Sequence, residues 1–333
     1  MVTEYKRAPI KLIILRQNGK KIDFTSQVTS ITWAGDENTD PRQLDVTMMN
    51  TTSILRRRKH QDFNFGDLAF LYSDGKEIFR GMIFQRTTNS DGTEQFTAYD
   101  NLIYLSKGQD TVLYKNKPAH EIVRAQLQAA GIPINYLAGT NYTVKKMLCE
   151  GMSRSEIITN ALEEATNNTG EKFKLRSELG KARLTKRKGA AKSTISVDDV
   201  ISSSNKASIE DLVTQVLVTK GSLDSEDKNF KSVKLSNDPL LKKYGYLQQV
   251  ITVDDKASLT AMKVAGTQHL RKGANETIEI SIEFVGDVNC ITGNKIEIKD
   301  TLTRLSSEYY ISSDSHTWEN GMHTMSLQLS KRL

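Results

Sequence analysis

The stretch His316-Thr317-Trp318-Glu319-Asn320-Gly321-Met322-His323-Thr324-Met325 decides the fold. Asn320-Gly321 is a dipeptide favoured by two-residue type I′ hairpin turns, in which both central residues have positive φ. A hairpin with this turn pairs Trp318 with His323, and His316 with Met325. One face then carries His316, Trp318, His323, Met325, Leu327 and Leu329, and the other carries Ser and Thr. The pattern predicts an amphipathic hairpin that covers a hydrophobic core.

Short strands of the same kind are expected through the first hundred residues. Residues 11–17 end at Asn18-Gly19, and residues 68–72 and 77–84 flank Ser73-Asp74-Gly75. Such β-branched and aromatic runs, separated by turn residues, are typical of hairpins. Further strands are expected at residues 28–34, 44–49, 85–88 and 95–99. Many short strands with tight turns indicate a small barrel or sandwich.

The middle of the chain has helical spacing instead. A first helix is expected after Pro118, and a second after Ser153, which stands three residues before Glu156 in the spacing of a capping box. A small hairpin follows at residues 173–176 and 182–184. The basic stretch that ends at Lys192 is then expected to be a linker.

The last third returns to strands, with one intervening helix. Strands are expected at residues 212–219, 230–235, 246–253 and 278–284, and a helix at residues 256–271. We therefore predict a mainly β fold with an α/β insert, in which two tube-like β-barrel domains flank a small mixed domain. The expected domains are residues 1–110, residues 111–192 with the basic linker, and residues 193–333. We expect the two barrels to share one fold, although no residue-level repeat is visible.

Composition narrows the function classes. The 333 residues carry a net charge of +6, and the basic runs lie at residues 56–59 and 181–192. No aromatic residues interleave these runs, so solvated loops are favoured over nucleic-acid recognition. Mean hydropathy is −0.46, and no apolar run is long enough for a signal-peptide core or a spanning helix, which predicts a soluble chain. Cys149 and Cys290 are expected to be reduced thiols.

Catalytic motifs are missing from the sequence. It contains no G-x-S-x-G, H-E-x-x-H, Walker or G-x-G-x-x-G pattern. The acidic pairs Glu163-Glu164, Glu210-Asp211 and Asp254-Asp255 resemble helix caps and solvated faces more than an acid and base pair. We therefore predict a protein that is not an enzyme, with no catalytic residues and no cofactor.

The best candidates for metal ligands are Asp314, His316 and His323, which the hairpin register places on one face. Trp318, Met325 and Leu327 share that face, which favours half-buried histidines satisfied by hydrogen bonds. We therefore predict no metal site. The remaining histidines are isolated in the sequence and are expected to be surface or packing residues: His60, His120 and His269.

Two groups of short segments carry a family resemblance. The first is Phe65-Gly66-Asp67-Leu68-Ala69-Phe70-Leu71 with Glu77-Ile78-Phe79-Arg80-Gly81-Met82-Ile83. The second comprises residues 293–300, Tyr309-Tyr310-Ile311 and the closing hairpin. In order and spacing they resemble the baseplate hub proteins of contractile-tailed phages and phage-tail-like particles, of the PBSX-prophage hub type related to the late control D proteins. The resemblance covers nearly the whole chain and is weakest at residues 181–229.

The resemblance implies a structural function. A hub of this kind is a homotrimer whose six barrels form a pseudo-sixfold ring, which adapts the tail tube to the central spike. Its partners would be other copies of the chain, the tail tube protein, the central spike protein, and other baseplate and LysM-type tail proteins. DNA would pass through the ring without sequence-specific binding. The virion or tailocin baseplate would be assembled in the bacterial cytoplasm.

Two other function classes stay open from the sequence alone. A receptor- or carbohydrate-binding tail protein would also be rich in strands and lack catalytic motifs. A tail-associated cell-wall hydrolase would need a catalytic constellation, which the sequence patterns do not indicate. Imaging of a particle that carries the labelled subunit would separate the structural hub from both.

Overall fold

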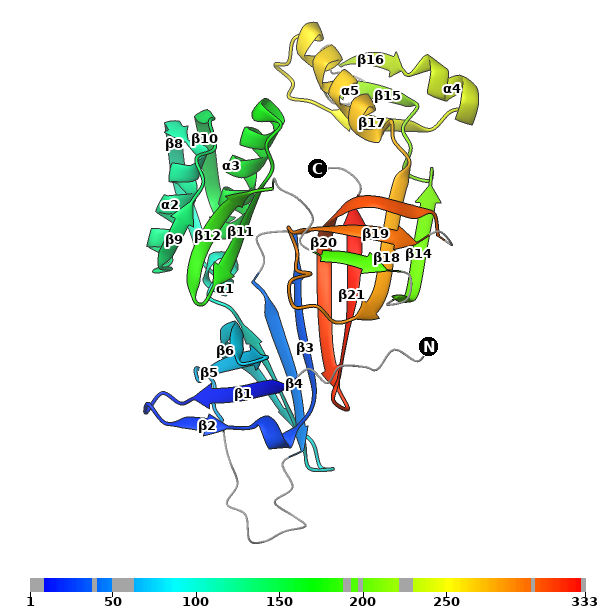
Figure 1. The fold of residues 1–333 in the computed structure, drawn as a ribbon. Helices are drawn as coiled ribbons and strands as arrows, with labels where there is room; N and C mark the ends of the chain where they lie inside the picture. Colours follow the sequence, from blue (N-terminus) through cyan, green and yellow to red (C-terminus); the bar gives the residue numbers. More distant parts are fainter. Residues whose placement is uncertain are drawn as a thin grey trace. The chain divides into compact units, whose positions relative to one another are not determined.

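The computed structural model describes residues 9–37, 41–49, 63–187, 193–196, 200–221, 230–300 and 303–330. The chain divides into two compact units, one formed by Met1–Ser204 with Ile280–Leu333 and the other by Asn205–Glu279. Figure 1 shows that strands dominate the first unit, which confirms the predicted mainly β class. The described part contains no helix that is long and apolar enough to cross a membrane.

Two sets of six strands lie wholly or partly in the first unit, and we name them the first and second modules; only β14 and β18 extend beyond the boundary of this unit. The first module consists of β1 (Ile10–Leu15), β3 (Val28–Asp36), β4 (Gln43–Met49), β5 (Leu68–Ser73), β6 (Lys76–Thr88) and β7 (Thr93–Tyr99). The second module consists of β13 (Ser193–Ser196), β14 (Val200–Ser208), β18 (Thr277–Val285), β19 (Lys295–Asp300), β20 (Leu305–Glu319) and β21 (Met322–Ser330). The short strand β2 (Lys21–Asp23) extends the β1 edge, and a 3₁₀ turn, Thr25–Gln27, follows it.

The two modules have the same strand order. Neighbouring strands run β1-β5-β6-β7-β4-β3 in the first module and β13-β19-β20-β21-β18-β14 in the second. Numbered along the chain within its own module, each order reads first, fourth, fifth, sixth, third, second. One difference is that β1 pairs with β5 antiparallel, whereas β13 pairs with β19 parallel. The shared order supports the expectation that the two β parts are copies of one fold.

The repeat extends to single residues at the start of the fourth strand. Gly66 N donates to Ile83 O (3.1 Å), and Ile83 N donates back to the carbonyl of the residue that follows Gly66. Gly293 N donates to Ile311 O (2.9 Å), and Ile311 N returns the equivalent bond. Gly66 and Gly293 have φ of 85° and 87°, values that favour glycine. The equivalence of Gly66 and Gly293 is not visible in the sequence because the side chains around the two glycines differ.

The modules share one continuous sheet. Residues 30–36 of β3 pair antiparallel with residues 313–319 of β20. Each module nevertheless surrounds its own buried apolar cluster. The Trp318 side chain comes from β20 but packs in the cluster of the first module. This strand pair is therefore a joint between the two modules, and we refer to it as the β3–β20 joint.

The closing hairpin has the predicted register. Trp318 pairs with His323, and His316 with Met325, as the turn dipeptide predicted. Asn320 and Gly321 have φ of 52° and 77°, which is the backbone of a type I′ turn. In the first module, by contrast, residues 77–84 and 85–88 form the single strand β6, with a register shift against β7 between Ile83 and Gln85.

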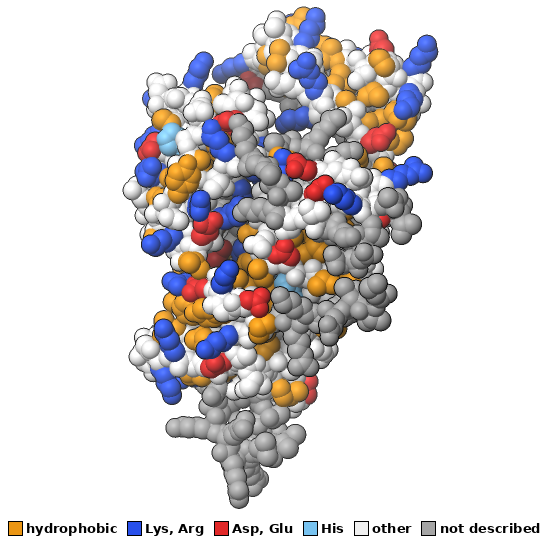
Figure 2. All heavy atoms as spheres, viewed as in Figure 1, with side chains coloured by type: hydrophobic (Ala, Val, Ile, Leu, Met, Phe, Trp, Pro, Cys, Tyr) orange, Lys and Arg blue, Asp and Glu red, His pale blue; other side chains and the backbone are white. Residues whose placement is uncertain are grey.

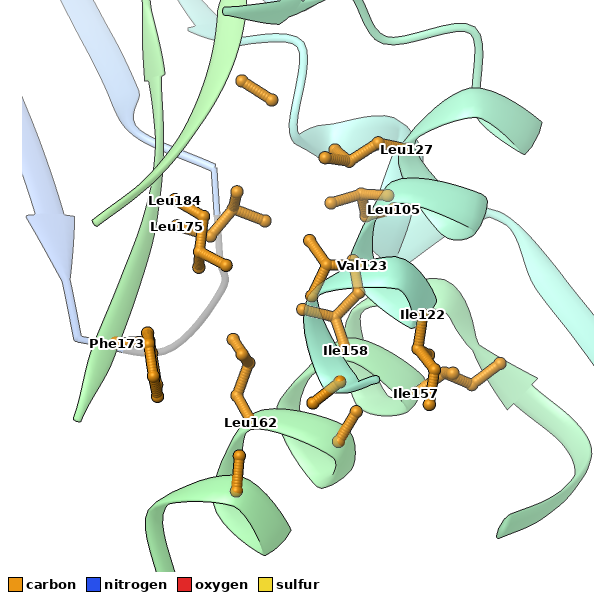
Figure 3. Packing of buried hydrophobic residues seen from close by; sticks show 14 of the residues in the cluster. Leu105, Ile122, Val123, Leu127, Ile157, Ile158, Leu162, Phe173, Leu175 and Leu184 are labelled. Carbon is orange, nitrogen blue, oxygen red and sulfur yellow. The ribbon is translucent and has the colours of Figure 1, made fainter. Parts of the chain in front are cut away.

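The α/β insert follows the first module. Its elements are α1 (Ile103–Lys107), β8 (Gln109–Pro118), α2 (Ala119–Ala129), β9 (Ile134–Leu137), β10 (Thr143–Ser153), α3 (Arg154–Thr169), β11 (Phe173–Glu178) and β12 (Lys181–Lys186). Figure 3 shows side chains of α2 and α3 facing Leu175 and Leu184 across a buried core. The capping box is confirmed, since Glu156 N donates to Ser153 Oγ and Ser153 N donates to Glu156 Oε2.

The small hairpin predicted at residues 173–176 and 182–184 is confirmed, since β11 pairs antiparallel with β12. The strand β12 extends to Lys186, so it includes two residues of the stretch that was expected to be a linker. Ala182 and Leu184 are buried, while Lys181 projects outward, so the run alternates as a strand does. Arg187 is also buried and pairs with Glu37 (3.1 Å). Residues 188–192 and the other basic run, residues 56–59, lie outside the described residues. The face in Figure 2 shows acidic and basic side chains intermingled.

The second unit is a feature that the sequence patterns did not predict. Its sheet has the order β16 (Lys231–Ser236), β15 (Gln215–Lys220), β17 (Gln248–Thr252), and its helices are α4 (Asp238–Tyr244) and α5 (Leu259–Gly273). Residues of β15 and α5 form a buried cluster of its own. The expected helix at residues 256–271 corresponds to α5, with Ser258 as its N-cap. The predicted boundaries near residues 110 and 192 stay a prediction.

Candidate functional site

The densest set of buried polar groups lies at the β3–β20 joint. Arg42 Nη1 donates to Asp314 Oδ1 (3.0 Å), and Arg42 Nη2 donates to Asp314 Oδ2. Thr292 N also donates to Asp314 Oδ1 (2.6 Å), and Thr292 Oγ1 lies 3.0 Å from Gly35 O. Burial acts to raise the pKa of Asp314, but the Arg42 charge outweighs it and holds that pKa below its usual value. A bidentate, charge-assisted pair of hydrogen bonds from Arg42 to Asp314 thus connects the two modules at the joint.

Aromatic rings surround this ion pair. The Arg42 guanidinium lies 3.9 Å from the centre of the Trp33 ring. The Trp33 and His316 rings are 5.2 Å apart, and the Trp318 and His323 rings stack at 4.0 Å. Both tryptophans of the chain therefore lie at the joint.

The two histidines of the hairpin bond to each other. His316 Nδ1 and His323 Nε2 are 3.1 Å apart, and His316 Nε2 lies 3.2 Å from Cys290 O. Because a carbonyl can only accept, we assign the proton of His316 to Nε2, and His323 Nε2 then donates to His316 Nδ1. Burial lowers the pKa of His316 to about 4 and that of His323 to about 3. Both rings are neutral at neutral pH.

A second polar group ties the α/β insert to the first module. The Lys174 ammonium donates to Asp36 O (2.5 Å), and burial, reinforced by the Arg187 charge, lowers the pKa of Lys174 to about 7. The buried carboxyl of Asp100 accepts bonds from the backbone N–H groups of Arg42 (3.2 Å) and Leu102 (2.9 Å). Burial nevertheless raises the pKa of Asp100 to about 6.

These groups border a cavity of about 790 Å³. Its walls come from the first module, from β11 of the insert, and from the loop between β18 and β19. The lining includes Arg42, Asp100, Lys174 and His323. The side chains bond mainly to protein groups of the joint, so the arrangement is suited to holding three parts of the chain together.

The structure brings the candidate metal ligands together but uses them otherwise. Asp314 Oδ2 lies 3.5 Å from His316 Nε2, and both Asp314 oxygens are occupied by Arg42. Within the described ranges, no group of three His, Cys, Asp or Glu side chains is arranged to hold a metal ion. The absence of a metal site stays a prediction.

The other candidate residues lie apart. His120 contacts Thr140, His269 contacts Gln249, and His60 lies outside the described residues. Cys149 and Cys290 are buried free thiols, and burial raises the pKa of Cys290 to about 12, which opposes thiolate formation. The acidic pairs Glu163-Glu164, Glu210-Asp211 and Asp254-Asp255 are far from the joint in sequence, and we assign them no chemistry.

Sequence reasoning missed Arg42, Asp100, Lys174 and Thr292. Arg42 and Asp314 are 272 positions apart, so no local spacing connects them. The available signal was weak: Asp314 was expected on the buried face of a hairpin, and a buried carboxylate requires a cationic or N–H partner.

The fold and the joint define a protein of two repeated β modules, the architecture found in solved phage tail proteins. The family model described as YQBQ-like matches residues 31–330, and the chain belongs to this family. It is 27% identical over 311 residues to the phage-like element PBSX protein XkdQ of Bacillus subtilis (strain 168), covering 91% of this chain and 92% of XkdQ.

Two solved structures share the fold at low identity. The 43 kDa tail protein of prophage MuSo2 from Shewanella oneidensis has a TM-score of 0.72 at 11% identity, covering 96% of this chain and 98% of that one. The E. coli c3393 protein, a type VI secretion component with structural similarity to T4 tail proteins gp27 and gp5, has a TM-score of 0.53 at 10% identity. That match covers 98% of this chain and 76% of that one.

Proposed function

We propose that this chain is a structural subunit of a phage tail or phage-tail-like particle, and that it serves there as the baseplate hub. The YQBQ-like family, the PBSX relative and the fold shared with tail proteins support the tail assignment. The likeness to a protein that itself resembles T4 gp27 and gp5 supports a position near the tube and spike.

The observation that carries the hub role is the repeated module within one chain. Two modules with the same strand order are joined edge to edge by the β3–β20 joint. Three such chains supply six similar modules around one axis, so a threefold oligomer presents a nearly sixfold ring. This geometry adapts a sixfold tail tube to a threefold central spike.

The proposed role is assembly and not turnover. At the joint Arg42 bonds to Asp314, and the two histidines bond to each other and to a backbone carbonyl, which suits a connection that transmits force. The proposed partners are other copies of the chain, the tube, the spike and neighbouring baseplate proteins, with DNA passing through the ring. The proposed location is the baseplate of a particle assembled in the bacterial cytoplasm.

Electron cryomicroscopy of tail particles that carry the tagged chain tests the proposal. We expect three copies in one ring between the tube and the spike, with six β modules around the channel. A ring of six chains, a single copy, or density confined to receptor-binding fibres would contradict the hub role.

A further inference from the structure

The β3–β20 joint shows how one module connects to the next. The donor edge is β3, the second strand of the first module. The acceptor edge is residues 313–319, the C-terminal half of β20, the fifth strand of the second module. That half is available because β19 pairs only with residues 305–310 of β20.

The same two kinds of edge recur at two places where no joint is found among the described strands. In the second module the second strand is β14, which ends the continuous sheet next to β18. It has nine residues, as β3 has. In the first module the fifth strand is β6, in which β5 pairs with residues 76–82 only. Residues 85–88 pair with β7 on one side, and no described strand pairs with their other side. Gln85, Thr87 and Thr88 are exposed.

We propose that β14 of one chain pairs antiparallel with residues 85–88 of β6 in a second copy of the chain, and so repeats the β3–β20 joint between subunits. This inference rests on the proposed function and specifies its subunit interface. Each chain then donates β14 to one neighbour and accepts β14 from another. Such a head-to-tail contact closes into a ring when the rotations add to a full turn.

Side-chain bonds indicate the register of this joint. Ser202 Oγ donates to Glu283 Oε2 (3.2 Å) and Lys206 Nζ to Glu279 Oε2 (3.2 Å), which places β14 antiparallel to β18. Ser203 Oγ bonds to the buried Asp300, so Ser203 faces inward as Ile31 does in β3. We align Ser203 of β14 with Ile31 of β3, and β6 with β20. The β3–β20 register then puts Lys206 of one chain opposite Thr87 of the next.

The chemistry of both edges suits a main-chain contact. β14 reads Val-Ile-Ser-Ser-Ser-Asn-Lys-Ala-Ser, and the facing segment of β6 reads Gln-Arg-Thr-Thr. Apart from Val200 and Ile201 at the start of β14, these side chains are small or polar, so backbone hydrogen bonds supply the contact, as in strand addition to a sheet edge. A contact of this size is weak alone, and ring closure strengthens it because the final joint forms within one assembly.

Cysteine crosslinking tests the joint. We would introduce T87C and K206C, together and separately, and treat tail particles and the concentrated purified chain with a short thiol crosslinker. Cys149 and Cys290 are buried and leave a low background. We expect the double variant to form covalent dimers and trimers. Each single variant should stay monomeric on a denaturing gel, and mixing the two single variants should restore dimers only.

The outcomes separate the joint from the proposed function. Particles that contain three copies of the chain without crosslinks in the double variant would overturn the joint and leave the hub role standing. Efficient crosslinking of T87C alone would indicate a symmetric contact and would also overturn the joint. A chain absent from tail particles would contradict the hub role, and crosslinking of the purified chain would then decide the joint.

Discussion

Acidification should open the β3–β20 joint. Both histidines at the joint have pKa values in the folded chain below the ordinary value of about 6.5, near 4 for His316 and near 3 for His323. The unfolded chain therefore binds protons at these groups first as pH falls. The stability that the two neutral rings contribute is complete above pH 6.5 and is lost as pH falls toward 4.

The magnitude follows from the shifts. From pH 6.5 to pH 5 the contribution of each histidine to the free energy of unfolding falls by about 2 kcal/mol, at about 1.4 kcal/mol per pH unit. The carboxyl of Asp100 works in the opposite direction, because its raised pKa of about 6 favours protonation in the folded state and returns about 1 kcal/mol at pH 5. Asp314 has a lowered pKa and loses stability only below its ordinary range. The lowered pKa of Lys174, about 7, changes little across this window. The net loss of stability is about 3 kcal/mol, which is a large share of the ~5–15 kcal/mol that is typical for the free energy of unfolding of a protein.

Tryptophan fluorescence during urea unfolding is the suitable assay, since Trp33 and Trp318 both lie at the joint. The urea midpoint of this signal should fall markedly between pH 7 and pH 5. The variant H323Q keeps an amide donor and does not titrate, so its pH dependence should shrink by about 2 kcal/mol. H269Q changes a partly buried histidine outside the joint, so this variant is the matched control and should retain the full dependence.

Two results would refute this reasoning. The first is a fluorescence midpoint that is the same at pH 7 and pH 5. The second is an H323Q variant whose pH dependence equals that of the unaltered chain, since the histidine pair would then not be the titrating group.

Three further outcomes are expected. G286A should destabilise the joint by about 1–3 kcal/mol, because the new Cβ would lie 2.1 Å from the His323 ring, whereas G139A, with no atom within 4 Å, should be nearly neutral by the same urea assay. S153A should lower the unfolding free energy by about 1 kcal/mol through loss of the α3 cap, and a cap-retaining S153T should recover most of it; equal midpoints for all three chains would contradict this. Peptidoglycan zymography with the purified chain should show no cleared band; a band that disappears when one carboxylate is neutralised would contradict the structural role.

Features with local causes were predictable from the sequence. Asn320-Gly321 determines the hairpin register because a type I′ turn admits two residues with positive φ. Ser153 and Glu156 determine the start of α3 because each satisfies the other's backbone N–H. The alternation in residues 278–284 likewise predicted a strand, of which Ile280, Ile282 and Phe284 are buried.

Features that depend on distant partners were decided by the tertiary structure alone. Arg42 reaches Asp314, and Lys174 reaches Asp36, across intervals that carry no local signal. The extension of the predicted hairpin strand through residues 185–186 was hidden because Lys and Arg side chains can extend to water from a strand whose other face is buried. The two modules were expected to share one fold, but the residue-level correspondence was hidden, because Gly66 and Gly293 make equivalent backbone hydrogen bonds while the side chains around them differ. Main-chain pairing constrains the backbone and leaves most side chains free to vary.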